Sequence, residues 1–372
     1  MSNGNAATKK KKRIFYFDAL RALAITAVIL FHSAVRMKFH IWSFHGDLFN
    51  FNWLYGDFFW ACMIIGVDLF LMLSGALSLG RDWSIKSFLG RRLPRIVGPF
   101  LFWAISLCSF IVLLQWQFPD LLQVLDSFTI TEYLKFIYSA IMYKSPYFAP
   151  YWFFWMILGT YLIMPVFNKW LLHADLKEAE YFLAIWLISC LFDYTLNTAF
   201  PVKISYFAGP IGMVVLGYYL RYTDRKIFSN LYIPIILIIL GMIGALYGSY
   251  LYTTPDILFK FDRYSIFLVM EVTGVFLLYR NLSNVNLNIG FFSNPDGIFR
   301  KSVFSIAKYS YGFYLIHQAI MDLIIKALKY FDLFNGYKLL LLFIFVSTFM
   351  VSWIVMAAFN RIPYVNRVIG AK

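Results

Sequence analysis

The sequence predicts an all-α polytopic membrane protein, a bundle of about ten transmembrane helices with its N- and C-termini in the cytoplasm. Of the 372 residues, 61% are hydrophobic and only 14% are charged, and the mean hydropathy is +0.68. A soluble domain carries a larger share of charged side chains. Apolar runs of about 20 residues, the length at which an α-helix crosses a bilayer, recur along the chain.

The chain is expected to form one membrane domain, 14–360, between two cytoplasmic tails, 1–13 and 361–372. The first tail ends in five consecutive basic residues, which hold it on the cytoplasmic side. The ten expected spans are 14–35, 58–79, 99–117, 151–170, 181–199, 205–220, 231–252, 264–282, 306–328 and 339–359. The first apolar run is longer than the core of a signal peptide, so we expect it to remain as a span.

Two connecting segments have a distinctive composition. Residues 118–148 mix acidic and apolar side chains, which favours an amphipathic helix at the membrane interface. Residues 81–95 are strongly basic and are expected on the cytoplasmic side. Because proline disrupts helices, we expect Pro94 and Pro99 to break the helix where the chain enters its third span.

The formal net charge of +14 is explained by membrane topology. With the spans above, 22 of the 33 Lys and Arg residues lie on the cytoplasmic side and 10 on the outer side, as the positive-inside rule requires. The basic residues are not gathered in a soluble recognition module, so we expect membrane lipids as partners and no nucleic acid. Cys62, Cys108 and Cys190 lie in apolar runs without metal-ligand spacing, and we expect no metal site.

The first span carries three ionisable residues on one face. Arg21 and His32 are eleven residues apart, so on an α-helix they lie within about 20° of each other and roughly 16 Å apart along the axis. Asp18 lies about 40° to the other side. Ionisable groups inside a membrane face a protein interior or a water-filled cavity, so this stripe predicts a polar functional site. The alternative is that Arg21 snorkels to the headgroups and that His32 lies in the outer headgroup layer.

A basic cluster follows the second span. Arg91, Arg92 and Arg95 fit one helical turn, and arginine binds phosphate through bidentate, charge-assisted hydrogen bonds. The cluster therefore predicts a phosphate site. The alternatives are an ordinary topology-setting loop and contact with anionic lipid headgroups.

Further polar residues lie inside the spans and are expected to support the substrate site or the structure. Asp68 and Glu271 are near mid-membrane, where a carboxylate needs a partner. Ser74, with the glycine after it, allows close helix packing. Tyr314 and His317 are three residues apart and adjacent on one helix; a buried, hydrogen-bonded structural histidine is the alternative to a functional one.

Four motifs occur in a distinctive order over nearly the whole chain. They are Asp18-x-x-Arg21-x10-His32, Phe70-x-x-x-Ser74-Gly75, Phe88-x-x-Arg91-Arg92-x-x-Arg95-Ile-x-x-Pro99 and Ser310-Tyr311-x-x-Tyr314-Leu-Ile-His317. This set resembles membrane acyltransferase family 3, whose members are ten-span enzymes that O-acylate glycans and other extracytoplasmic acceptors.

The resemblance implies residue roles. His32 matches the family's catalytic histidine, and Arg21 matches the basic residue paired with it. The basic cluster at 91–95 matches the stretch associated with the acyl-CoA end of the site. One departure is visible, because many relatives carry a His-Leu-Trp-Phe-like element where residues 150–153 read Pro-Tyr-Trp-Phe. The identity of the acceptor therefore stays open.

The resemblance also implies the reaction. Acyl-CoA, with acetyl-CoA as the expected donor, would bind from the cytoplasm, and His32 would act as general base on a hydroxyl of a glycan or lipid-linked saccharide. An acyl-histidine relay is the variant, and Asp18 or Asp68 would orient a partner. O-acetylation of a polysaccharide in a bacterial inner membrane is the expected setting. The alternatives are a flippase or exporter of lipid-linked glycan and an acyltransferase with a non-glycan acceptor.

Overall fold

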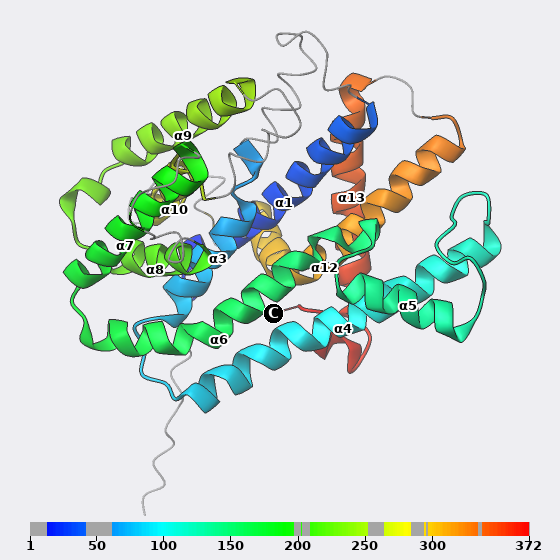
Figure 1. Ribbon diagram of the computed structural model, residues 1–372, viewed down its shortest axis with the longest axis horizontal. Helices are drawn as coiled ribbons and strands as arrows, with labels where there is room; N and C mark the ends of the chain where they lie inside the picture. Colours follow the sequence, from blue (N-terminus) through cyan, green and yellow to red (C-terminus); the bar gives the residue numbers. More distant parts are fainter. Residues whose placement is uncertain are drawn as a thin grey trace, which may run out of the picture.

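The computed structural model describes residues 13–41, 62–196, 202, 209–251, 264–283, 294, 297–333 and 337–371, and in this part of the chain every regular element is a helix (Figure 1). The long helices are α1 (Phe15–Ile41), α3 (Gly66–Ser78), α4 (Ile85–Gln117), α5 (Ile130–Ile141), α6 (Trp152–His173), α7 (Leu176–Leu191), α8 (Pro210–Tyr222), α9 (Tyr232–Leu251), α10 (Ile266–Leu282), α12 (Ile298–Tyr330) and α13 (Tyr337–Phe359). The shorter turns are η1 (Pro146–Tyr151), η2 (Phe192–Leu196), η4 (Lys226–Phe228) and η6 (Val365–Arg367). The predicted all-α class is confirmed.

Several helices have the length and composition of membrane spans. Within the described residues five helical segments are long and apolar enough to cross a membrane, namely Phe15–Arg36, Ile85–Gln117, Pro146–His173, Leu176–Leu196 and Leu340–Phe359. Gly66–Ser78 and Tyr232–Tyr247 are shorter apolar helices. These helices support a multi-pass membrane protein, whereas the number of ten spans and the cytoplasmic placement of both termini stay predictions.

Helix α1 runs through the middle of the bundle, with α3 on one side and α12 and α13 on the other (Figure 1). Glycines bring α3 into backbone contact with its neighbours. A Cβ atom on Gly66 would lie 2.6 Å from the carbonyl oxygen of Ala24 in α1, and one on Gly75 would lie 1.8 Å from that of Val214 in α8. Small residues permit this close packing of membrane helices, so α3 packs tightly between α1 and α8.

Helix α4 differs from the sequence-based expectation. It runs without interruption over Ile85–Gln117 with Pro94 and Pro99 inside it, so the predicted break at the entrance of the third span is wrong. Each proline removes one N–H group and displaces one carbonyl, but the other hydrogen bonds of the helix remain, and α4 packs against α5, α6 and α12. The basic cluster at 91–95 therefore stands on a helix that continues into the bundle.

A buried glutamine fixes the loop between α4 and α5. The Gln115 side-chain amide donates to the carbonyl oxygen of Leu125 at 2.7 Å, and its oxygen accepts from the N–H groups of Val124 and Leu125, both at 2.9 Å. The loop leads into α5, whose exposed face carries Ile130 and Leu134. The predicted helix in this segment is present, and its position at a membrane surface stays a prediction.

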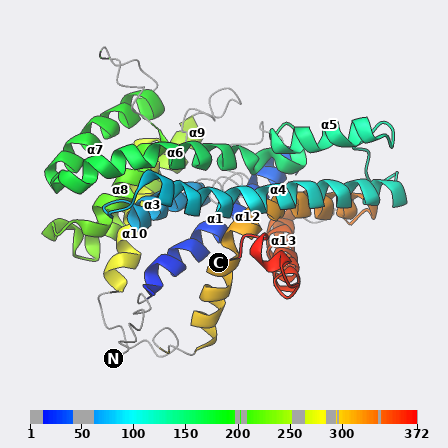
Figure 2. The same ribbon diagram turned by 90° about the horizontal axis from the view of Figure 1, so that it is seen from below.

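The last residues fold back under the bundle beside α4 and α12 (Figure 2). Ile369 is fully buried, and its carbonyl oxygen accepts a hydrogen bond from the indole N–H of Trp103 at 3.0 Å. Gly370 has φ +81°, and a Cβ atom there would lie 3.0 Å from the ring of Tyr311. Because this backbone region favours glycine, Gly370 lets the chain turn close against α12.

Candidate active site

A cavity of about 1370 Å³ opens between the N-terminal parts of α1 and α4, the C-terminal end of α3, α6 and α12. Its basic lining residues are Arg13, Arg21, Arg81, Arg91, Arg92, Arg95, Arg221 and Lys308, and its acidic ones are Asp18 and Asp82. We call it the arginine cavity. Basic side chains outnumber acidic ones four to one, so the cavity attracts a ligand with several negative charges.

Asp18 organises the basic side chains that α1 contributes. Its carboxylate is 3% exposed and accepts hydrogen bonds from Arg13 Nε at 2.5 Å and from Arg21 Nη1 at 3.2 Å. The hydrogen bond from Arg13 raises the pKa of that guanidinium, so it stays charged. The predicted stripe on the first span thus places Asp18 and Arg21 together at the wall of the arginine cavity.

The basic cluster of α4 lies on the same wall. Arg92 donates to Ser78 Oγ at 2.5 Å, and its guanidinium lies 5.7 Å from the ring centre of Phe88 and 5.9 Å from that of Tyr161. Arg95 is exposed at the opening. Several guanidiniums, some of them held by hydrogen bonds, surround one space and suit the spread charges of phosphate groups.

Two histidines that lie far apart in the sequence meet between α1 and α12. The ring centres of His32 and His317 are 5.2 Å apart, with the ring planes inclined by 42°. His317 is fully buried, and its Nδ1 lies 2.8 Å from the carbonyl oxygen of Tyr314 and 3.1 Å from that of Phe313. Since a carbonyl oxygen only accepts, Nδ1 carries the proton and Nε2 presents its lone pair. That Nε2 atom has no hydrogen-bond partner among the described residues.

The histidine pair lies close to the arginine cavity, next to its lining residue Tyr314. Tyr314 lines the cavity, and its ring centre is 6.1 Å from that of His317. The Tyr314 hydroxyl donates to the carbonyl oxygen of Pro150, and the Tyr151 hydroxyl donates to that of Leu315 at 3.1 Å. Residues 150–151 therefore hold α12 in place next to the histidine pair.

The other predicted site residues have different surroundings. Ser74 lines the arginine cavity and donates to the carbonyl oxygen of Phe70 at 2.9 Å. Asp68 and Glu271 are buried in α3 and α10 and are not among the lining residues of the arginine cavity. Glu271 packs against α9, because a Cβ atom added to Gly241 in α9 would lie 2.7 Å from the Cβ atom of Glu271. The predicted set thus divides into cavity residues, a histidine pair and buried acids.

Several cavity residues were not identified from the sequence. Arg13, Arg81 and Arg221 stand at the ends of apolar runs, where the positive-inside rule explains a basic residue without any site. Their convergence on one space is the additional information that the fold supplies. Tyr161 and Gly370 gave no signal, because an aromatic residue in a span and a glycine near a chain end are both common.

A family model described as an acyltransferase domain, that of acyltransferase family 3, matches residues 14–357 of the chain. No curated protein and no solved structure matches it.

Proposed function

Because the chain belongs to acyltransferase family 3, we propose that it is a membrane enzyme that transfers an acetyl group from acetyl-CoA to a hydroxyl of a glycan or lipid-linked saccharide. The arginine cavity is the observation that carries the proposal. It joins a strongly basic opening, suited to the phosphates of CoA, to a wall one helical turn from the histidine pair.

The donor would bind with its phosphates near Arg91, Arg92 and Arg95 and its pantetheine arm along the face of α1 that carries Arg21. Guanidiniums bind phosphate oxygens in pairs of parallel hydrogen bonds. Tyr314 lines the cavity and its ring centre lies 6.1 Å from that of His317, so an arm that extends toward Tyr314 would bring the thioester toward His32 and His317.

His32 would act as the general base. It takes the proton from the acceptor hydroxyl while the oxygen attacks the thioester carbonyl carbon. The tetrahedral intermediate then expels CoA as a thiolate, and the proton held by His32 passes to the sulfur. His317 would act as a positioning residue, because its Nδ1 is held by the Tyr314 carbonyl oxygen and its ring centre lies 5.2 Å from that of His32.

The distribution of charge supports the direction of transfer. The basic tail and the basic cluster at 91–95 lie on one side in the predicted topology, which is the cytoplasmic side by the positive-inside rule. Acetyl-CoA is made in the cytoplasm, so the arginine cavity would open to the donor, and the acceptor would come from the other side. A bacterial inner membrane would be the location.

Transfer from radiolabelled acetyl-CoA into glycan in inverted membrane vesicles tests this function. We expect His32→Gln and Arg21→Ala to lower transfer at least a hundredfold. His173→Gln, which changes an exposed histidine at the end of α6, is the matched control and should keep full activity.

Three outcomes are informative. Equal transfer by wild type and His32→Gln would refute the catalytic role of His32. If no protein transfers label while lipid-linked glycan still crosses the membrane, the chain is a flippase or exporter. Label recovered in a protein or small molecule would identify a non-glycan acceptor.

A further inference from the structure

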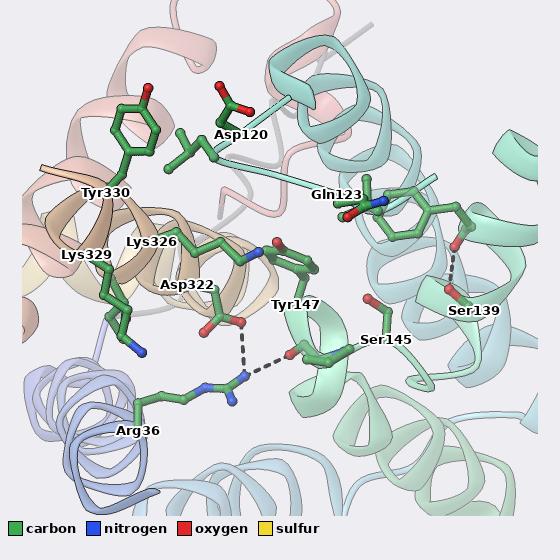
Figure 3. Close-up of a pocket in the computed structure, with 15 residues that line it drawn as sticks. Arg36, Asp120, Gln123, Ser139, Ser145, Tyr147, Asp322, Lys326, Lys329 and Tyr330 are labelled. Atoms are coloured by element: carbon green, nitrogen blue, oxygen red, sulfur yellow. Dashed lines mark hydrogen bonds and ion pairs between the residues drawn. The ribbon is translucent and has the colours of Figure 1, made fainter. Parts of the chain in front are cut away.

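Figure 3 shows a second cavity, of about 850 Å³, which is distinct from the arginine cavity. Its walls come from α1, the loop between α4 and α5, α5, η1 and the C-terminal part of α12. We call it the mixed cavity, because its polar lining combines both charges with neutral groups. The charged members are Arg36, Asp120, Asp322, Lys326 and Lys329, and the neutral ones are Gln123, Ser139, Ser145, Tyr147 and Tyr330.

The mixed cavity starts about one helical turn beyond the histidines. Arg36 follows His32 by four residues on α1, and Asp322 follows His317 by five on α12, which are rises of about 6 and 7.5 Å. Arg21, at the arginine cavity, lies about 16 Å from His32 in the opposite direction along α1. The two cavities therefore approach the same histidine pair from its two ends.

A fixed ion pair forms the floor of the mixed cavity. Arg36 Nη2 donates to Asp322 Oδ2 and to the carbonyl oxygen of Pro146, both at 3.0 Å (Figure 3). Gln318 Nε2 donates to Asp322 Oδ1 at 3.1 Å. Asp322 is 9% exposed, so this carboxylate is held in place by two donors and keeps further lone pairs for a ligand.

The loop on the opposite wall is also held in place. Gln115 makes three hydrogen bonds to the backbone of Val124 and Leu125, and Val124 lines the cavity. A binding site gains affinity when its walls are ordered before the ligand arrives. The mixed cavity thus has the rigidity of a binding site on both sides.

The chemistry of the lining selects the class of ligand. Three basic and two acidic side chains nearly balance, unlike in the arginine cavity, so a polyphosphate is not favoured here. An acyl chain could not pair with the lone pairs that the lining carboxylates and hydroxyls keep for a ligand, which is unfavourable. A sugar hydroxyl both donates and accepts, and so matches a lining that offers carboxylates, ammonium groups, hydroxyls and amides side by side. The volume is in the range of small-molecule sites, about 300 to 1,000 Å³.

We infer that the mixed cavity is the acceptor site, that its ligand is a hydroxyl-rich saccharide, and that the Arg36–Asp322 pair positions this saccharide with one hydroxyl at His32. The inference rests on the proposed function, because it assigns the acceptor of that reaction. It adds residues that belong to none of the four sequence motifs.

Blocking the cavity from outside tests the assignment. Ser139→Cys places a thiol in the mixed cavity, and Ser127→Cys places one on the exposed loop nearby, outside both cavities. Cys62, Cys108 and Cys190 are buried, and treated wild type controls for them. Spheroplasts are treated with a sulfonated, membrane-impermeant maleimide, and inverted vesicles made from them are assayed for acetyl transfer and for binding of labelled CoA.

We expect both cysteines to be modified, and transfer to fall at least tenfold only in Ser139→Cys, with CoA binding unchanged. Full transfer by modified Ser139→Cys would overturn the inference, as would failure of the maleimide to reach it. Partition of the labelled product between butanol and water distinguishes a lipid-linked saccharide from a free glycan. CoA binding without transfer in untreated wild type would instead contradict the proposed function.

A second variant covers the case in which Ser139→Cys is inactive before treatment. Asp322→Asn keeps the side-chain size but removes the charge that holds Arg36. With glycolipid extracted from the same membranes as the acceptor, we expect its KM to rise at least tenfold and the KM for acetyl-CoA to stay unchanged. An unchanged acceptor KM would overturn the inference.

Discussion

On the proposed function, the histidine pair is the residue-scale feature on which the chemistry depends. His317 offers one lone pair in a fully buried position, and its ring orientation is set by two backbone carbonyls rather than by solvent. A base whose neighbour is fixed needs little rearrangement when it takes a proton, which is the advantage of a preorganised site.

At this scale we expect His317→Asn to lower kcat about a hundredfold while the KM for acetyl-CoA stays unchanged, because on the proposed function the donor would contact the arginine cavity. Asparagine keeps an N–H for the two carbonyls but has no ring beside His32. Steady-state kinetics in vesicles measures kcat and KM separately, and thermal unfolding in detergent shows whether the variant is folded. A wild-type kcat in a folded variant would assign His317 a structural role.

The residue scale also shows what the sequence can and cannot predict. The helical period places Asp18, Arg21 and His32 on one face of α1, and Asp18 and Arg21 do meet at one cavity wall. The approach of His32 to His317 joins residues 285 positions apart, so no local pattern contains it. The same holds for Arg36 and Asp322, whose pairing needs the tertiary packing of α1 against α12.

At the scale of elements, the close packing of α3 fixes the positions of α1 and α8 relative to each other. We expect Gly75→Ala to destabilise the protein by about 1–3 kcal/mol, because the new methyl group would meet the Val214 carbonyl and force the helices apart. Gly159→Ala in α6 is the control, since nothing lies within 4 Å of its Cβ position, and alanine favours helix. Thermal unfolding in detergent compares the two. Equal melting temperatures would show that α3 and α8 separate easily.

The elements also explain where sequence reasoning failed. Proline propensity predicts a break in the helix at the entrance of the third span, yet α4 continues through Pro94 and Pro99. Local propensity gives way to packing here, because neighbouring helices stabilise the turns on both sides of each proline. The amphipathic composition of 118–148, by contrast, was enough to predict α5.

For the whole molecule, the proposed function and the arginine cavity together imply that donor binding stabilises the fold. The eight basic side chains repel one another when no anion is bound, because only two acidic side chains offset their charge. We expect CoA to raise the melting temperature of the purified protein, since a ligand at a hundred times its Kd adds about 2.7 kcal/mol. Pantetheine lacks the phosphates and is the control. An equal rise of the melting temperature with pantetheine would show that the pantetheine arm, and not the phosphates, supplies the binding energy.

The same cavity has a consequence for metabolism. On the proposed function, its basic lining would bind the phosphates of CoA, which the reaction leaves unchanged, so free CoA would be held about as tightly as acetyl-CoA. Product and substrate then compete for one place. The extent of glycan acetylation would then follow the ratio of acetyl-CoA to CoA in the cell rather than the amount of acetyl-CoA alone. The degree of acetylation of the glycan would therefore vary with the carbon supply of the cell.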